Sequence, residues 1–522
     1  MQEQEKKLGL PSVVATGVGL IVATGCLLSI GQGASAIGTS FIWTMIIACI
    51  FNILTALSIC ELNALMPNLS GGMAQYTLAS FGPFVAIVIT VGGYLICQTL
   101  MGTSETAMFG NTLSSVLTDV PIPSYVYSIA MVILLTLFNW FGVDMFAKIQ
   151  NIVAYSLIGS LMIVGILGCL EIGTGEPVEQ EAIISSDIED IFGQLGLAFY
   201  LFIGVECIVP ISNQVKNPRK NVPLGMMLSL IIILIMQCFL TIGFSKYTPW
   251  DELAESTVPH ILYGSLLLGN FGTIWMTIVS LLAVVSTCNT ALFSISQICY
   301  GMAKINLLPK FFMRQNKHGT PYAGLLIISA CIILLNLTGL ADSDSLTFLI
   351  LVGSTFWILS YIILHCDVLA LRKRMPKAPR TFKVPLGPVI PILGIIGNAF
   401  MIYNIDSDWD AKLKIYAVCL IFLVLLSIYA VIWIKCVMKR PLFKPYAIKE
   451  VMAMDTDLYQ IHHDPELAEK MHLEAKPEVE SMSAEYNTGT RPEDISVPVS
   501  KTSTDTAENT SRDTLNDQAP DG

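Results

Sequence analysis

The chain has few charged residues and none of the short motifs that mark common enzymes. Only 13% of its 522 residues are Asp, Glu, Lys or Arg, whereas 53% are hydrophobic. A soluble domain does not need so much apolar surface, so the composition predicts a protein that crosses the membrane several times. The sequence also lacks the GxxxxGK[ST], HExxH and GxSxG motifs, which argues against an ATPase, a zinc protease and a serine hydrolase. We therefore expect a protein that is not an enzyme and does not bind nucleic acid.

The cysteines form no framework. There are 13, scattered through apolar segments without a CxxC pair or a cluster with histidine. Such cysteines are typical of small packing residues in a reducing compartment, so we expect no disulfide, metal or cofactor. The polar head MQEQEKK leads directly into an apolar span that looks retained, which argues against a cleavable signal peptide.

About twelve apolar runs are long enough to cross roughly 30 Å of hydrocarbon. The chain is therefore predicted to be an all-α polytopic membrane protein. A head (1–10) precedes a transmembrane domain (11–440), and an acidic tail (441–522) follows, which we expect to be disordered and solvated rather than a plug. The expected spans are 11–33, 40–64, 83–115, 124–141, 147–170, 190–212, 222–246, 271–301, 322–340, 345–370, 387–404 and 413–436.

Loop charges orient these spans. The loops after the sixth, eighth and tenth spans are basic, with residues such as Arg219, Lys310 and Arg372, whereas the loops on the other side are mainly acidic. Because cytoplasmic loops are enriched in Lys and Arg, both termini are expected in the cytoplasm and the protein in the cytoplasmic membrane.

Two spans are interrupted by glycine. The first break lies in ATGVGLIVATG (15–25), and the second lies in AFYLFIGVE (198–206), which also carries Glu206 within the apolar run. Glycine lets the backbone leave helical geometry, and the freed polar groups are tolerated in a membrane only where they line a protein cavity. Two such breaks at matching positions of two halves indicate the midplane site of a secondary transporter. A carboxylate inside a span points to the same kind of site.

Four ordered motifs together resemble the amino acid–polyamine–organocation superfamily of transporters, closest to its bacterial amino acid and polyamine antiporters. They are ALSICELNALMPNLSGGMAQYTLASFGP (56–83), FIGVE with NQVKNPRKNVP (202–223), ISQICYGMAKINLLPKFF (295–312) and RKRMPKAPRTFKVPLGPVIP (372–391). The resemblance covers about residues 11–440. It implies an inverted five-plus-five (LeuT-like) fold, with repeats at 11–170 and 190–370 and two further helices within 387–436.

The resemblance also implies a substrate site at the two breaks. The N–H groups of Thr24 and Gly25 would bind a substrate carboxylate, in keeping with the affinity of helix N-termini for anions. Carbonyl groups of the second break would bind the ammonium group, and an aromatic side chain would close over the solute. The expected substrate-binding residues are Ile21, Ala23, Thr24, Gly25, Met101, Glu105, Tyr200, Phe202, Ile203 and Gly204, with Glu206 as a gating or coupling group.

The sequence departs from the family pattern at two places. The family's GSG loop reads ATG here, which adds bulk at Ala23. Many proton-coupled members carry a lysine in the fifth span, where this chain has Tyr155, Ser156 and Leu157. Exchange without a lysine-based proton switch is therefore favoured.

Several polar residues within spans also have simpler interpretations. Glu206 could merely cap a helix break, and Glu105, whose face Gln98 and Met101 are expected to share, could bond to nearby Thr or Asn side chains. Structural roles are expected for Glu61, Ser286 and Asn289, and interfacial water around His365 and Asp367.

These observations together predict secondary active transport of an amino acid by alternating access, through exchange or proton coupling. One alternative is a carrier for an amine without a carboxylate, such as ethanolamine or a polyamine, held by Glu105 and Glu206. A less favoured alternative is a non-transporting sensor that recruits partners through its tail. The expected partners are a small-molecule substrate and the lipid bilayer, and the oligomeric state stays open.

Overall fold

The computed structural model describes residues 8–66, 69, 71–117, 121–178, 180, 187–209, 211–339, 345–378, 380 and 382–454. This part of the chain is built from helices and their connections and contains no strand, only two isolated bridges. Its helices are α1 (Leu10–Ile21), α2 (Thr24–Ile37), α3 (Phe41–Leu65), α4 (Met73–Ser80), α5 (Pro83–Thr90), η1 (Val91–Ile96), α6 (Cys97–Val116), α7 (Ser124–Trp140), α8 (Val143–Cys169), α9 (Ile188–Gly193), α10 (Leu195–Tyr200), η2 (Val205–Ile208), η3 (Ser212–Gln214), α11 (Pro218–Tyr247), α12 (Trp250–Glu255), α13 (Pro259–Lys304), η4 (Lys310–Met313), α14 (Tyr322–Leu337), α15 (Leu346–Arg374), α16 (Val389–Tyr403), α17 (Trp409–Trp433), η6 (Ile434–Met438) and α18 (Ile448–Ala453).

The prediction of an all-α polytopic membrane protein is confirmed. Among the described residues, seven helices are long and apolar enough to cross a membrane, and the bent pair α1–α2 makes an eighth candidate. Four shorter apolar helices, within α7, α10–η2, α14 and α16, lie at the positions of the remaining expected spans. The count of twelve stays a prediction, because these four are shorter than a full crossing requires.

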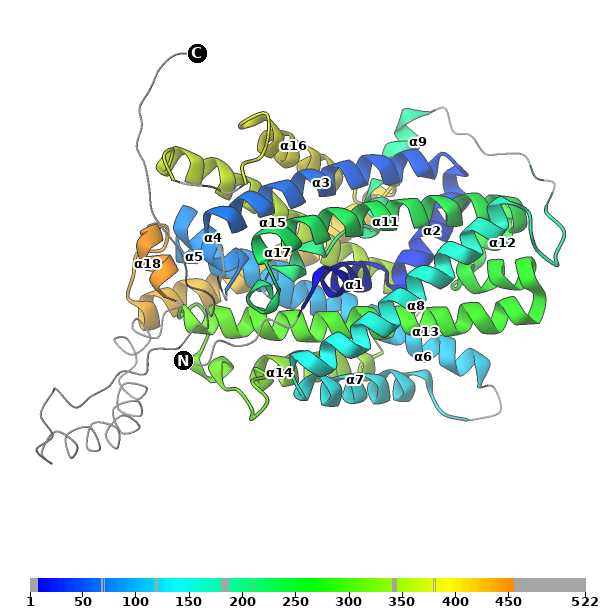
Figure 1. Ribbon diagram of the computed structural model, residues 1–522, viewed down its shortest axis with the longest axis horizontal. Coiled ribbons are helices and arrows are strands. Elements are labelled where there is room, and N and C mark those ends of the chain that lie inside the picture. Colours follow the sequence, from blue (N-terminus) through cyan, green and yellow to red (C-terminus); the bar gives the residue numbers. More distant parts are fainter. Residues whose placement is uncertain are drawn as a thin grey trace, which may run out of the picture. The chain divides into compact units, whose positions relative to one another are not determined.

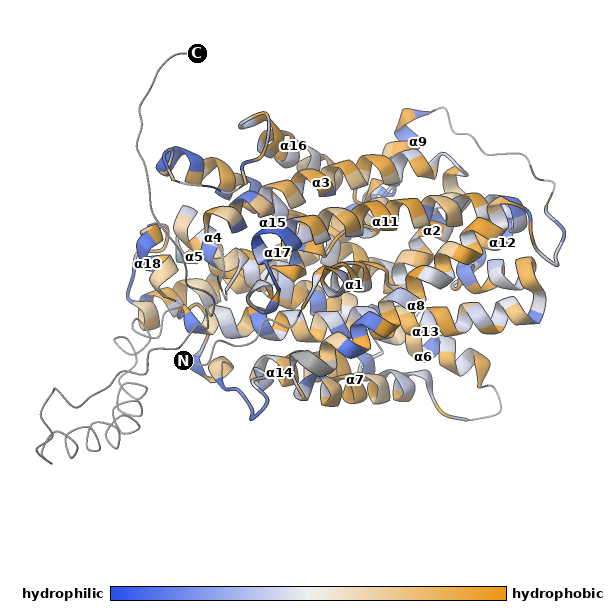
Figure 2. Cartoon of the chain, viewed as in Figure 1, coloured by the Kyte–Doolittle hydropathy of each residue, from blue (hydrophilic) through white to orange (hydrophobic). Residues whose placement is uncertain are grey.

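The long helices run side by side along the bundle, as Figure 1 shows for α3, α11 and α13. Hydrophobic residues cover their length, whereas hydrophilic residues gather mainly toward the ends of the bundle, including α18 and the loop before α16 (Figure 2). This distribution suits a protein whose middle is surrounded by hydrocarbon.

The broken helices lie inside the bundle. Helix α1 packs against α8, α11 and α13, and α10 packs against α2, α3 and α15. Every residue of α1 from Val13 to Ile21 is buried. By contrast, α17 lies at the periphery, with only 22% of its most apolar stretch buried.

The described chain continues past Arg440 as a packed segment, residues 441–454, which we call the C-terminal strap. Its backbone bonds to two helices, because the N–H of Tyr446 donates to the Leu78 carbonyl (3.2 Å) and the N–H of Phe84 donates to the Leu442 carbonyl (3.0 Å). The strap ends in α18. The expected disordered tail from residue 455 onward lies outside the described residues.

The expected structural role of Glu61 is confirmed. Its buried carboxylate pairs with Arg372 (2.8 Å from Nε to Oε1) and also accepts the backbone N–H of Val384 (2.8 Å). This link ties the end of α3 to the loop after α15.

Inter-helix bonding by the polar residues of α13 is confirmed too. Asn289 accepts from the Asn139 amide (2.9 Å) and donates to Gln150 (3.2 Å), which itself donates to the Ser286 hydroxyl (2.9 Å). These bonds join α13 to α7 and α8.

The expectation of interfacial water around His365 and Asp367 is wrong. Both side chains are fully buried. His365 bonds to the hydroxyls of Thr55 (3.1 Å) and Ser58 (2.9 Å), and Asp367 accepts from Thr77 (2.7 Å). Hydroxyls of α3 and α4 thus replace water at these positions, a substitution that the sequence of α15 alone does not reveal.

Candidate functional site

The first break separates α1 from α2 at the place that the glycine pattern predicts. The two helices meet at a bend of 57°, and the connecting residues Val22 and Ala23 have non-helical backbone angles. Ala23 precedes α2 and offers no side-chain cap. The first N–H groups of α2 therefore need an acceptor from elsewhere in the protein.

That acceptor is the carboxylate of Glu105, on α6. The N–H of Thr24 donates to Oε2 (3.1 Å), and the N–H of Gly25 donates to Oε1 (3.0 Å). The Tyr200 hydroxyl also donates to Oε1, at 2.6 Å. The carboxylate is 1% exposed. It is stabilised by three donors and by the positive end of the helix dipole.

The donors expected to bind a substrate carboxylate are therefore bonded to the protein's own carboxylate. Thr24 uses its hydroxyl elsewhere, since Oγ1 donates to the Ser280 carbonyl of α13 (3.0 Å). Gly25 leaves no room for a larger side chain, because a Cβ atom there would lie 2.5 Å from Glu105 Oε1. In this structure the carboxylate of Glu105 occupies the start of α2.

The second break lies between α10 and η2, in the turn formed by residues 201–204. Gly204 has φ 111° and ψ −4°, a conformation that favours glycine. A carbonyl freed by the turn is satisfied from outside, since Gln237 of α11 donates to the Leu201 oxygen (3.2 Å). The break is thus held within the protein, as backbone polar groups at this depth require.

A small cavity lies between the two breaks. Its volume is about 20 Å³ for the centres of water molecules, room for about one water and not for an amino acid. An amino acid could enter this cavity only if the elements that line it moved apart. The cavity is lined by Leu20, Ile21, Gln98, Met101, Glu105, Tyr200, Ile203, Thr287 and Trp357.

Five of the expected site residues lie around this cavity: Ile21, Met101, Glu105, Tyr200 and Ile203. Gln98 lines it too, so the expectation that it shares a face with Met101 and Glu105 is met. The other expected residues do not line the cavity. Four of them lie at the two breaks: Ala23, Thr24, Gly25 and Gly204. The side chain of Phe202 is fully buried.

Glu206 lies outside the cavity and holds the second break against α15. Its carboxylate accepts from the Trp357 indole N–H and from the Tyr361 hydroxyl (2.6 Å). The same Tyr361 oxygen accepts from the N–H of Gly204, at 3.3 Å. This arrangement is compatible with a gating role, because any movement of α15 against the break must rearrange these bonds.

Sequence reasoning missed Trp357, Tyr361 and Thr287. Thr287 donates to the Gly19 carbonyl of α1 (3.2 Å) and faces the cavity from α13. Trp357 and Tyr361 sit in an apolar span in which aromatic residues can equally face lipid. Their four-residue spacing places them on one helix face, and that was the available signal.

Among the described residues, no cationic side chain pairs with the two buried carboxylates beside the breaks. Glu105 and Glu206 are hydrogen-bonded to neutral donors, and within the described chain neither forms an ion pair. Charged groups in a membrane protein usually pair or line a pathway for solutes and ions.

Known proteins resemble this chain over most of its length. The model of the amino acid permease family matches residues 8–425. The chain is 24% identical to the branched-chain amino acid permease of Bacillus subtilis, over 82% of this chain and 93% of that protein. It is 26% identical to the human Asc-type amino acid transporter 1, over 76% of this chain and 77% of that protein. A methylthioribose transporter of Bacillus subtilis is 21% identical, over 72% and 83% of the two chains.

Proposed function

The chain belongs to the amino acid permease family, and from this premise we propose that it carries an amino acid across the cytoplasmic membrane by secondary active transport. The observation that carries the proposal is the meeting of two helix breaks around one buried cavity, lined by Glu105 and Tyr200. Transporters with inverted repeats bind their solute at such paired breaks. We also propose that residues 11–170 and 190–370 form two inverted halves and that both termini lie in the cytoplasm.

Binding of an amino acid requires a rearrangement at α2. Its carboxylate would replace Glu105 at the N–H groups of Thr24 and Gly25, and its ammonium would then face the displaced carboxylate of Glu105. A buried carboxylate without a partner raises the free energy of the protein. Pairing of the displaced Glu105 with the substrate ammonium therefore makes the displacement favourable. Alternating access would follow from rocking of α6 and α15 against the broken helices.

Exchange is the mode that the residues of α8 support. Gln150 of α8 donates to the Ala15 carbonyl of α1 (3.1 Å), and no lysine stands at the position used by many proton-coupled relatives. Because Gln150 does not ionise, this contact between α8 and α1 does not depend on a proton.

A second candidate, a carrier for an amine without a carboxylate, is favoured by the position of Glu105. Since Glu105 already fills the anion site, an ammonium group alone can complete the site without displacing it. One relative is named for a solute that is not an amino acid, so the family relation is compatible with this candidate.

Counterflow in liposomes tests both candidates. Purified protein is reconstituted with each amino acid or amine inside, and uptake of the labelled solute is followed with and without a pH gradient. Exchange of an amino acid without the gradient supports the first candidate, and exchange of amines alone supports the second. Absence of exchange with every solute of both classes contradicts a carrier.

A further inference from the structure

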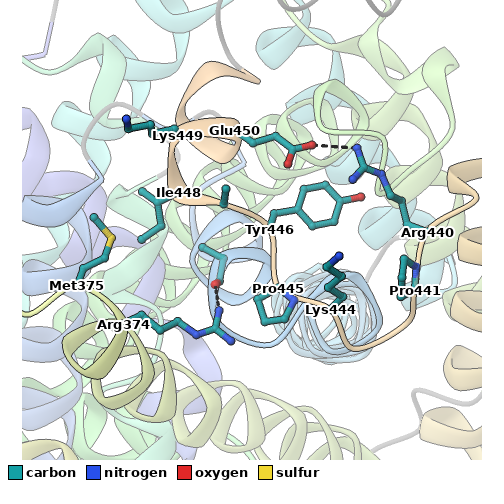
Figure 3. A pocket seen from close by; sticks show the side chains of 12 residues that line it. Arg374, Met375, Arg440, Pro441, Lys444, Pro445, Tyr446, Ile448, Lys449 and Glu450 are labelled. Atoms are coloured by element: carbon teal, nitrogen blue, oxygen red, sulfur yellow. Dashed lines mark hydrogen bonds and ion pairs between the residues drawn. The ribbon is translucent and has the colours of Figure 1, made fainter.

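A second, larger pocket lies at the end of the bundle where α4, α15 and the C-terminal strap meet. Its volume is about 580 Å³, within the range of pockets that bind small ligands. Four basic residues line it: Arg374 at the end of α15, Arg440 before the strap, and Lys444 and Lys449 in the strap. Figure 3 shows these side chains around the pocket, together with Tyr446 and Glu450.

The positive charge of this pocket exceeds the negative charge that the described residues supply. Arg440 pairs with Glu450 at 3.0 Å and lies 5.0 Å from the centre of the Tyr446 ring. Arg374 donates to the Ala79 carbonyl at 2.7 Å. Lys444 and Lys449 are exposed and, within the described chain, take part in no ion pair. The pocket thus offers ammonium groups to an anion.

An apolar surface lies along α17, which ends at Trp433, seven residues before Arg440 of the pocket. Leu420, Val424, Ile428 and Ile432 of α17 are all about half exposed or more, as expected for a helix that faces lipid. Next to the pocket, Phe443 is 61% exposed and its ring packs 5.0 Å from that of Phe84. An exposed aromatic ring beside basic groups is typical of the membrane interface.

We propose that this pocket binds the phosphate headgroup of an anionic phospholipid, whose acyl chains lie along α17. The site faces the cytoplasmic leaflet if the termini are cytoplasmic, and that leaflet is the anionic one. A soluble phosphate offers the same headgroup chemistry, but it has no acyl chain that could contact the apolar surface beside the pocket. The lipid would fasten the strap to the end of α15 by neutralising the charges of Lys444 and Arg374 together.

Thermal unfolding of the full chain in detergent tests the proposal. The protein is titrated with phosphatidylglycerol, phosphatidylcholine or inorganic phosphate, and the midpoint of unfolding is followed. The test variant is Lys444→Gln with Lys449→Gln. The matched control is Lys435→Gln with Lys439→Gln, which removes two exposed charges near the pocket but outside its lining. General attraction to an anionic surface is the same for both pairs.

We expect phosphatidylglycerol to raise the midpoint of the wild-type chain and of the control variant, with phosphatidylcholine and phosphate having little effect. The test variant should need at least about tenfold more phosphatidylglycerol for the same rise. An equal response of test and control variants overturns the site, and an equal rise with inorganic phosphate overturns the assignment to a lipid. Because both lysines are exposed and unpaired within the described chain, the test variant is expected to fold.

Discussion

Replacing Glu105 by glutamine is the perturbation that distinguishes the two candidate substrates most sharply. The carboxylate accepts the N–H of Thr24 on one oxygen, and the N–H of Gly25 and the Tyr200 hydroxyl on the other. A glutamine side chain has one acceptor oxygen, and its NH₂ group only donates. The variant therefore loses the negative charge and leaves at least one N–H at the start of α2 without its acceptor.

The magnitude follows from the hydrogen bonds that change. A hydrogen bond to a charged group contributes about 1.5–3 kcal/mol, so an amine that pairs with Glu105 should bind roughly 10- to 150-fold more weakly to Glu105→Gln. For a zwitterionic amino acid that must displace Glu105, the substitution has two opposing effects on affinity. Its carboxylate meets a weaker competitor, while its ammonium loses a charged partner, so its affinity should change by less than about tenfold.

Equilibrium binding of the labelled solute to purified protein measures this effect. Glu252→Gln is the control, since it removes the same charge from an exposed position on α12. An affinity for an amine that stays within twofold of the wild-type value would refute the pairing of a substrate ammonium with Glu105.

Three further predictions concern other parts of the site and the fold. Tyr200→Phe removes the 2.6 Å bond to Glu105 and should weaken solute binding by about tenfold or more in the same assay; unchanged binding would show that this hydroxyl is not part of the site. Arg372→Met leaves buried Glu61 with a weaker partner, Arg380 at 3.4 Å, and should lower the free energy of unfolding by about 3 kcal/mol in a denaturant titration, with Glu61→Gln in the same chain recovering part of the loss. Ending the chain after Met454 keeps every described contact of the strap and should preserve counterflow; loss of exchange would show that transport depends on residues beyond the strap.

Much of the fold could be predicted because hydrocarbon imposes length and composition on each span. The two breaks were also predictable, since glycine in an apolar run allows the nearby backbone, here residues 22–23 and 201–204, to leave the helix. The side chains that complete the site were harder to predict. The sequence places Glu105 among the expected substrate-binding residues. It does not reveal that α6 brings this carboxylate to the start of α2, which depends on packing between distant helices.

The partners of polar and aromatic side chains on α15 could not be predicted from the sequence either. Trp357 and Tyr361 read as ordinary aromatic residues of an apolar span, and their bonds to Glu206 exist only because α15 packs beside the second break. His365 and Asp367, further along the same helix, are buried against hydroxyls of α3 and α4. Whether such polar groups contact water depends on side chains of other helices that lie nearby in space, and not on the residues next to them in the sequence.

The most direct test of the central claim is the binding of the exchanged solute to Gly25→Ala, compared with the wild type and with Gly159→Ala. A Cβ atom at Gly25 would lie 2.5 Å from Glu105 Oε1 and 2.8 Å from the Tyr200 hydroxyl, whereas one at Gly159 meets nothing within 4 Å. If the solute binds at the two breaks, Gly25→Ala loses binding by at least about tenfold while Gly159→Ala binds normally and both elute as folded protein. Wild-type affinity in a folded Gly25→Ala protein would contradict a substrate site at the start of α2.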